Sequence, residues 1–189
     1  MSTIVDHQIT AMAQSHRMIE PFNPAQVNPA SYDVRIGSQI DVEGTTFGPE
    51  KYRERWHRLS LEHSIYYLQP GEFVLAVLQE YIRVPNGMEA QFQLKSSRGR
   101  EGYEHSLAGY ADPGYHGCMT LELRNVNRRH KLPLQMGMLI GQLRFAKLDA
   151  MPEQSYSETG HYHGDTTVQP SRVSINMEIT DWPLAGPGK

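Results

Sequence analysis

Short stretches of alternating apolar and polar residues dominate the chain and predict β-strands. Residues 29–37 follow a proline-rich loop and place Tyr32, Val34 and Ile36 on one face of a strand. Further strands are expected in HSIYYL, FVLAVLQEYIRV and MEAQFQL, which turn signals separate, and then in CMTLELRNV and LIGQLRFAKL. Because no long helical pattern interrupts this series, we expect a mainly β fold, a barrel or sandwich with antiparallel or mixed strands.

Three other stretches complete the predicted outline. The apolar run Phe73–Leu78 predicts a strand buried on both faces. Residues 5–19 repeat apolar side chains at helical spacing, which predicts a short N-terminal helix with Asp6 available as its N-cap. This apolar stripe consists of Ile9, Met12, Ala13 and Ile19. We expect residues 1–150 to form the β domain and residues 151–189 a polar tail, which is either disordered or a flap that orders over a ligand.

The composition fits one turn-rich domain. The chain has 189 residues, of which 39% are hydrophobic, 16 are Gly and 12 are Pro. A net charge of -3 predicts neither nucleic-acid wrapping nor docking on an anionic membrane. No apolar run approaches the roughly 18 residues of a membrane span, and the N-terminus lacks the order of a secretory signal. With Cys118 as the single cysteine, no internal disulfide is possible, and we expect a cytosolic protein.

Residues 94–101, LKSSRGRE, are the densest cluster of groups suited to phosphate. They offer positive charge, hydroxyl donors and a glycine that lets backbone amides approach an anion closely. In chain order these residues are Lys95, Ser96, Ser97, Arg98, Gly99 and Arg100. The spacing is not that of a Walker loop. A phosphate-binding turn and an ordinary solvated turn both fit this pattern.

Two carboxylates stand out as candidates for chemistry. Alternation in CMTLELRNV sends Met119, Leu121 and Leu123 to one face and Cys118, Thr120 and Glu122 to the other. Glu122 is therefore expected mid-strand and partly shielded from water, which suits general acid–base work; a paired structural glutamate is the alternative. Asp112 lies in the Gly- and Pro-rich loop of residues 105–117. That loop can bring Asp112 against a sugar or base, or simply link strands.

Three further features are given structural interpretations. His161 and His163 have no third ligand at a diagnostic spacing, so we expect no zinc site there. Cys118 is expected to be a buried apolar filler. The charged run KYRERWHR, residues 51–58, is expected to form a solvated face.

Taken in order and spacing, these segments resemble the dCTP deaminase family, which shares its fold with the trimeric dUTPases. The matching segments are residues 29–37, 94–102, 107–125, 132–145 and 170–172. The resemblance implies a homotrimer of distorted β-barrel subunits, active sites between neighbouring chains, and Mg²⁺ carried by the nucleotide triphosphate without zinc. A zinc nucleobase deaminase would also need a paired Cys-x-x-Cys, which one cysteine cannot supply.

The resemblance also assigns roles to residues. The glutamate of TLEL is the family's general base, so Glu122 is expected to take a proton from the water that attacks C4 of cytosine. Ser96 and Arg100 match the residues that hold this water and the developing charge. The other positions implied in substrate binding are Lys95, Ser97, Arg98, Gly99, His105, Ala108, Asp112, Thr120, Leu121, Tyr156, His161 and Asp165. Among these, Asp112 is expected at the deoxyribose, and the backbone of Thr120 and Leu121 at the base edge.

The sequence departs from the family pattern at several positions. Arg98 and Glu101 stand where hydrophobic residues are usual, and Leu107 where Thr or Ser is usual, which leaves feedback inhibition by dTTP open. His161 replaces a usual Lys. Asp165 replaces a usual Gln and is expected to repel a triphosphate unless Mg²⁺ or Arg98 intervenes.

Several functions fit this pattern. The main prediction is hydrolytic deamination of dCTP to dUTP and ammonia, which would supply dUTP for dTTP synthesis. The alternatives are a bifunctional enzyme that makes dUMP and pyrophosphate, a dUTPase alone, and a nucleotide-binding trimer without catalysis. The presence of Glu122, Ser96 and Arg100 favours an enzyme that deaminates.

Overall fold

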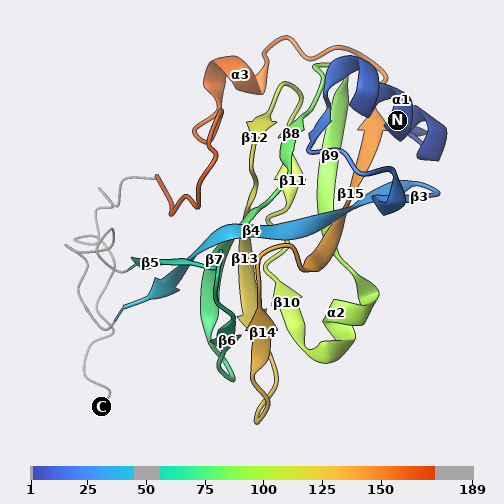
Figure 1. The fold of residues 1–189 in the computed structure, drawn as a ribbon. Coiled ribbons are helices and arrows are strands. Elements are labelled where there is room, and N and C mark those ends of the chain that lie inside the picture. The colour runs from blue at the N-terminus through green and yellow to red at the C-terminus, as the bar shows by residue number, and fades with distance from the viewer. Residues whose placement is uncertain (1, 45–55, 173–189) are drawn as a thin grey trace, which may run out of the picture.

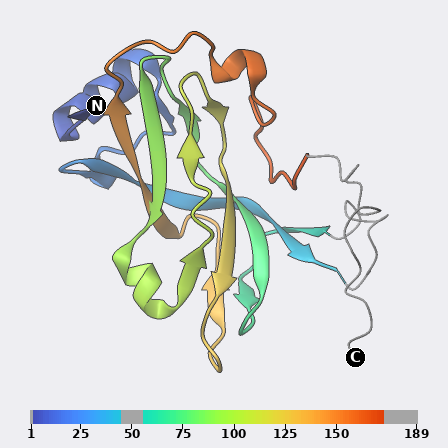
Figure 2. The same ribbon diagram turned by 180° about the vertical axis from the view of Figure 1, so that it is seen from behind.

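The computed structural model describes residues 2–44 and 56–172, whose antiparallel strands curl into a half-barrel (Figures 1 and 2). The strands are β1 (Ser2–Thr3), β2 (Ile19–Glu20), β3 (Val27–Asn28), β4 (Ser31–Glu43), β5 (Trp56–Ser60), β6 (Tyr66–Leu68), β7 (Phe73–Leu78), β8 (Tyr81–Arg83), β9 (Met88–Leu94), β10 (Tyr103–His105), β11 (Tyr110–Ala111), β12 (His116–Gly117), β13 (Thr120–Asn125), β14 (Leu132–Leu134) and β15 (Leu139–Lys147). The helices are α1 (Asp6–His16), the 3-10 helix η1 (Pro24–Gln26), α2 (Ser96–Glu101) and α3 (Tyr156–Thr159). The predicted mainly β architecture with a short N-terminal helix is confirmed.

The largest sheet follows the order β10-β13-β7-β4-β15-β9-β11, with β1 beside β15 and with β3 and β5 beside β4. A second sheet has the order β12-β8-β2, and β14 pairs with β6. Within the described residues, no helix has the length and continuous apolar sequence that a bilayer crossing requires.

Strand β4 joins the two halves of the largest sheet. Its residues 32–35 pair with β15, and its residues 36–42 pair with β7. The register shifts between Ile36 and Ile40. Gly37 lies in this shift, where an added Cβ would come within 2.9 Å of Val77 Cγ1 and 3.0 Å of the Leu78 carbonyl oxygen. Glycine therefore lets β4 approach β7 closely at the bend, which curls the sheet around its main apolar core.

The apolar run in β7 is buried as predicted, but the strand ends earlier than its sequence pattern indicated. Residues 74–78 are all buried. The stretch FVLAVLQEYIRV forms two strands because Glu80 turns inward between them and is fully buried. Its carboxylate accepts hydrogen bonds from the Arg35 backbone N–H at 2.8 Å and from Arg35 Nε at 2.7 Å. A buried ion pair thus replaces the continuous ladder that we expected.

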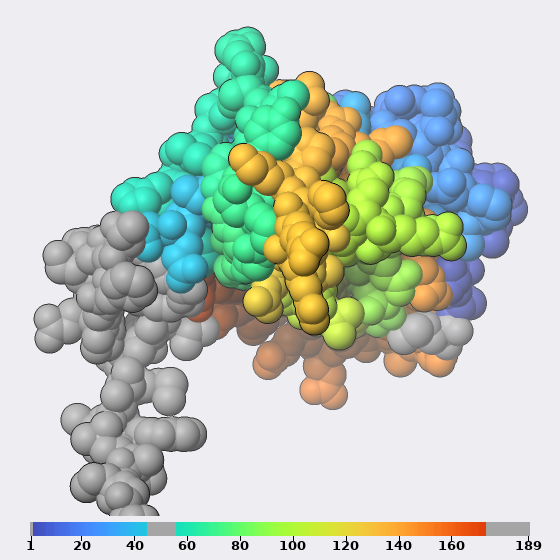
Figure 3. Space-filling model, turned by 90° about the horizontal axis from the view of Figure 1, so that it is seen from below, coloured from blue at the N-terminus to red at the C-terminus, as the bar shows by residue number. Residues whose placement is uncertain are grey.

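Two other local predictions are wrong in detail. Helix α1 has Val5 as its N-cap, and the Val5 N–H donates to Gln8 Oε1 at 3.1 Å, so Asp6 is the first helical residue and not the cap. Residues 96–101, predicted as a turn, form helix α2, which ends at Gly102 with a left-handed φ of 102°. Helix α2 and the β13–β14 connection lie side by side in Figure 3. The Asn127 side chain in this connection donates to the Glu101 carbonyl at 2.8 Å.

The tail docks on the small sheet through backbone and ring contacts. The Gly164 N–H donates to the His116 carbonyl at 2.8 Å. The rings of His116 and His163 have centroids 3.6 Å apart in an edge-on arrangement, and the Tyr81 hydroxyl bonds His116 Nδ1. His163 Nδ1 is buried and has no hydrogen-bond partner among the described residues. This contact holds residues 161–165 against β8 and β12, whereas residues 173–189 lie outside the described part of the chain.

We expect this docking to weaken in acid. Burial lowers the pKa of His116, and the charges of His163 and Arg83 lower it further; Arg83 is itself paired with Glu20. A depressed pKa means that the undocked state binds protons more readily, so docking is fully stable above the ordinary His pKa of about 6.5 and weakens as the pH falls below it. Hydrogen exchange of residues 156–168 at about pH 7.5 and about pH 5 measures this effect.

The His163→Phe variant keeps a ring against His116 but removes the second imidazole, so its protection factors, which correct for the intrinsic pH dependence of amide exchange, should depend less on pH. His130→Asn, which changes an exposed histidine elsewhere, should behave like the wild type. Equal protection factors of the wild-type tail at both pH values would contradict the role of this histidine pair.

Candidate active site

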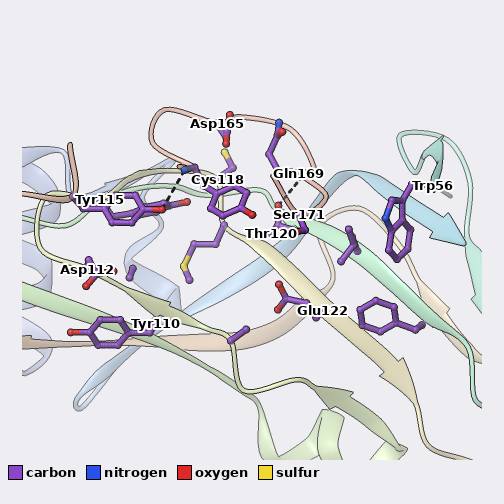
Figure 4. Close-up of a pocket in the computed structure, with 17 residues that line it drawn as sticks. Trp56, Tyr110, Asp112, Tyr115, Cys118, Thr120, Glu122, Asp165, Gln169 and Ser171 are labelled. Atoms are coloured by element: carbon purple, nitrogen blue, oxygen red, sulfur yellow. Dashed lines mark hydrogen bonds between the residues drawn. The ribbon is translucent and has the colours of Figure 1, made fainter. Parts of the chain in front are cut away.

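A cavity of about 410 Å³ opens between the largest sheet and the docked tail (Figure 4). Glu122 lies on its floor, with Tyr110 and Asp112 to one side and Trp56 to the other. Of the positions predicted from the sequence, the cavity brings together Ala108, Asp112, Thr120, Glu122, Tyr156 and Asp165. These residues come from the β10–β11 loop, the loop after β11, strand β13 and the tail, so the fold gathers segments that are distant in sequence.

Glu122 faces the cavity because of its place in the strand ladder. On β13, Leu121 and Leu123 are fully buried, while Thr120 and Glu122 are half-buried on the opposite face, as alternation predicted. Glu122 pairs with Leu75 of β7, whose side chain also lines the cavity. Leu121, which was predicted at the base edge, does not line the cavity, and its side chain belongs to the core.

His105 lies next to the Glu122 carboxylate. Its Nε2 atom is 3.3 Å from Glu122 Oε2, close enough for an ion pair if the imidazole is protonated, but neither atom has a hydrogen-bond partner among the described residues. The His105 side chain is 5% exposed and the Glu122 side chain 27%. The edge of Phe92, 4.8 Å away between ring centroids, holds the imidazole in place. A buried carboxylate oxygen without a partner is costly, so Oε2 is available to accept a proton or a hydrogen bond from a ligand.

A tight turn positions Asp112. The Tyr115 N–H donates to the Asp112 carbonyl at 3.0 Å, and the Gly114 N–H donates to the Val84 carbonyl at 3.0 Å, with Gly114 at a left-handed φ of 85°. This geometry requires glycine and leaves the Asp112 side chain toward the cavity. Asp112 is therefore more than a strand linker.

The tail covers the cavity, and within it the Asp165 carboxylate is paired with Arg172. Asp165 Oδ1 pairs with Arg172 Nη2 at 2.7 Å, and the same guanidinium bonds the carbonyl of His161 and Oε1 of Gln169. Within this chain, the carboxylate that we expected to repel a triphosphate is paired with Arg172. Asp165 Oδ2 remains buried without a hydrogen-bond partner among the described residues. His161 itself does not line the cavity.

The residues of the LKSSRGRE segment lie away from the cavity of their own chain. None of residues 95–100 lines it, and Figure 1 shows α2 at the end of the molecule opposite α3. Lys95 Nζ is paired with Asp33. Arg98 Nη1 pairs with Glu101 at 2.7 Å, and Arg98 Nε donates to the Leu139 carbonyl at 2.8 Å. The two departures at positions 98 and 101 therefore compensate each other.

The outward groups of α2 are those that a ligand could reach. Ser96, Ser97, Gly99 and Arg100 are exposed, and no ion pair of Arg100 occurs within the described residues. Within a single chain, Glu122 therefore lies apart from the hydroxyls of Ser96 and Ser97 and from the Arg100 guanidinium, although the resemblance assigns all of them to one site.

Sequence reasoning missed several cavity residues. Trp56, Phe73, Tyr110, Tyr115, Tyr162 and Gln169 line it without having been predicted. The tyrosines at 110 and 115 flank Asp112 in sequence, which was an available signal. Residues 51–55 lie outside the described part of the chain, and the prediction of a solvated face is wrong for Trp56, which lines the cavity. Arg58 is exposed as predicted, but it also bonds the tail.

The two residues before β13 keep the faces that alternation predicted, although the strand itself begins only at Thr120. Met119 is buried in the core with Leu121 and Leu123 and also borders the cavity, and Cys118 lines the cavity with Thr120 and Glu122. Cys118 packs against the apolar cluster of Leu75, Val77 and Val168 but is only half-buried, and burial raises the pKa of its thiol to about 11.

The cavity offers oxygen ligands for a hard cation but no dedicated cage. In residues 2–44 and 56–172, no three His, Cys, Asp or Glu side chains gather as a metal site. Asp112 and Asp165 both line the cavity, and the unpaired Asp165 Oδ2 suits the preference of Mg²⁺ for carboxylates combined with phosphate oxygens.

Comparisons with known proteins identify relatives of this chain. The model of the dCTP deaminase-like family matches residues 3–148. The "dCTP deaminase, dUMP-forming" of Aquifex aeolicus (strain VF5) is 40% identical over 163 residues, which are 85% of this chain and 88% of that protein. The enzyme of the same name from Bifidobacterium adolescentis is 36% identical over 192 residues, covering 92% of this chain and 96% of that protein.

A solved structure is also similar. The 2'-deoxycytidine 5'-triphosphate deaminase from Agrobacterium tumefaciens superposes with a TM-score of 0.63 at 25% identity. The match covers 76% of this chain and 48% of that one, so this chain spans about half the length of that protein. The predicted fold is confirmed by this likeness. Together with the family match and the two relatives, it shows that the chain belongs to the dCTP deaminase-like family.

Proposed function

We propose that the protein converts dCTP to dUMP, ammonia and pyrophosphate at one site. The prediction that dUTP is the released product is wrong, because the similar proteins are named as dUMP-forming dCTP deaminases. The bifunctional alternative takes its place. The proposal rests chiefly on Glu122, which is half-buried on the cavity floor and has a carboxylate oxygen without a hydrogen-bond partner among the described residues.

The first half of the reaction is hydrolytic deamination. Glu122 takes a proton from a water whose oxygen bonds to C4 of the cytosine ring. The carboxyl gives this proton to N3, then takes the proton of the new C4 hydroxyl and passes it to the amine, so that the C4–N bond breaks, ammonia leaves and the C4 carbonyl of uracil forms. His105, 3.3 Å from the carboxylate, orients Glu122. No zinc is used in this scheme, since the base is a side chain.

The second half consumes another water. Its oxygen bonds to the α-phosphorus of the deaminated nucleotide, the bond to the β-phosphate bridge breaks, and pyrophosphate leaves with dUMP remaining. Mg²⁺ carried by the triphosphate would be held by phosphate oxygens with Asp112 and Asp165, and it supplies charge neutralisation. The contribution of the chain to this step is to bind the nucleotide and to orient its α-phosphate for attack by water.

The same proposal assigns the parts of the nucleotide. Asp112 binds the deoxyribose, Ala108 and the backbone of Thr120 and Leu121 meet the base edge, and Tyr156 packs on the nucleotide from the closing tail. The position of Leu107, 94% exposed beside Ala108 with a left-handed φ of 61°, leaves no hydroxyl there for a dTTP-bound state.

We further propose that the site is completed by a neighbouring copy in a homotrimer. The support is the separation of α2 from the cavity of its own chain, together with the exposed hydroxyls of Ser96 and Ser97 and the guanidinium of Arg100. In a symmetric trimer, each α2 would face the cavity of the next chain, with Lys95, Arg98 and Gly99 supporting the phosphate path and His161 reaching it from the tail. One surface then serves both assembly and catalysis.

The assay that tests the function follows all products of dCTP and Mg²⁺. We expect ammonia, dUMP and pyrophosphate in equal amounts from the wild type. Replacing Glu122 with Gln removes the base but keeps its size, so ammonia release should fall by about 10²–10⁴-fold. Nucleotide affinity, measured by calorimetry, should change by less than about threefold.

The matched control is Glu104→Gln, an exposed glutamate on the neighbouring strand β10, which should keep wild-type turnover. Unchanged ammonia release by the Glu122→Gln variant would remove the proposed base. Accumulation of dUTP without dUMP would instead contradict the bifunctional reaction.

The shared site predicts complementation between inactive variants. Glu122→Gln and Arg100→Gln should each be inactive alone. In mixed oligomers, a site that takes Glu122 from one chain and Arg100 from the other is intact, so an equal mixture should recover about a quarter of wild-type activity. Failure to recover activity in oligomers shown to be mixed by tagged pull-down would contradict the shared site.

A further inference from the structure

We propose that Arg58 is a positioning residue that holds the tail closed over the active site before any nucleotide binds. This inference rests on the proposed function only for the expected rise in KM, because closure of the tail itself can be measured without turnover. Strand β5, which carries Arg58, pairs along the outer half of β4 and reaches the tail where residues 168–169 cross the cavity.

The guanidinium bridges the sheet and the tail. Arg58 Nε and Nη2 bond the two oxygens of Asp41 at 2.8 and 3.0 Å, and Nη2 also donates to the Val168 carbonyl at 2.6 Å. The Asp41 residue is 3% exposed. Its paired carboxylate raises the pKa of Arg58, so the bridge stays charged at any ordinary pH. A two-point contact to a buried carboxylate fixes the plane of the guanidinium and thus the direction in which the second N–H of Nη2 points toward the tail.

The tail segment that Arg58 bonds packs directly on strands β7 and β13. Val168 is fully buried against Leu75 and Val77. These residues of β7 stand opposite Glu122 and Thr120 in the ladder. The Gln169 N–H donates to Thr120 Oγ1 at 3.1 Å. The tail is thus fixed to the sheet next to the proposed base.

Closure of the tail brings the remaining lining groups into place. Tyr156, Tyr162 and Asp165 belong to the same docked segment, and Arg172 ties Asp165 to the residues that follow Val168. A chain whose tail is already docked pays no ordering cost when nucleotide binds. If the contact of Arg58 with Asp41 and Val168 is lost, fewer molecules have a closed tail. The apparent dissociation constant for the nucleotide then rises in inverse proportion to the fraction of closed molecules.

Arg58 acts through the tail and does not line the cavity. Its loss should therefore weaken substrate binding and leave the chemical step intact once the nucleotide has closed the tail. We expect Arg58→Gln to raise KM by about tenfold and to change kcat by less than about twofold. Arg58→Lys should restore part of the loss, because one ammonium reaches either Asp41 or the Val168 carbonyl but cannot reproduce the planar bridge.

Two further variants separate tail closure from folding. Asp41→Asn combined with Arg58→Gln avoids leaving a buried carboxylate alone, yet still lacks the bond to Val168. Val168→Ala removes apolar contact from the tail while the Arg58–Asp41 pair remains. Both should reproduce the rise in KM. Arg129→Gln, which removes an exposed charge from the β13–β14 connection, should match the wild type.

Hydrogen exchange of residues 156–169 without nucleotide tests closure independently of the reaction. We expect protection in the wild type and in Arg129→Gln, and faster exchange in Arg58→Gln and Val168→Ala. Equal protection in all four proteins would overturn the proposal, as would a fall in kcat at unchanged KM. If the wild-type tail is protected and the Arg58→Gln tail is not, but the wild type does not turn over dCTP, the proposed function is wrong while the role of Arg58 in tail closure is supported.

Discussion

The pairing of β13 with β7 is the constraint on which the site depends. It sets Glu122 opposite Leu75 and Thr120 opposite Val77. The same face of the ladder therefore carries the Glu122 carboxylate and the two apolar side chains, Leu75 and Val77, against which Val168 packs. The other face, with Leu121 and Leu123, belongs to the core. A slip of one residue would bury the carboxylate among apolar side chains and expose the leucines, which makes this register costly to change.

The cavity is lined by three parts of the chain. The sheet supplies Glu122, the turn after β11 supplies Asp112, and the tail supplies Tyr156 and Asp165. Each part is fixed by its own contacts: the ladder, the backbone bonds of the turn, and the anchors of the tail at His116 and Arg58. The fourth part, α2, faces away from this cavity, and we propose that it serves a neighbouring copy.

Sequence patterns predicted the strands well where one face is apolar. Alternation found β4 and the faces of β13, because side chains report burial directly in a period of two. It could not show that Glu80 would break a long apolar stretch, since the reason is a pairing with Arg35, 45 residues away in sequence. Arg58 was missed for a similar reason. Its partners, Asp41 and Val168, belong to a different strand and to the tail, so its charge looked like part of a solvated run.

The most direct test of the account is a crystal structure with Mg²⁺ and a dCTP analogue whose α,β-bridge resists cleavage. The account predicts C4 of cytosine beside Glu122 of one copy and the phosphates against Ser96 to Arg100 of a neighbouring copy, with the tail closed over both. A ring bound away from Glu122, or phosphates held without any neighbouring copy, would contradict it.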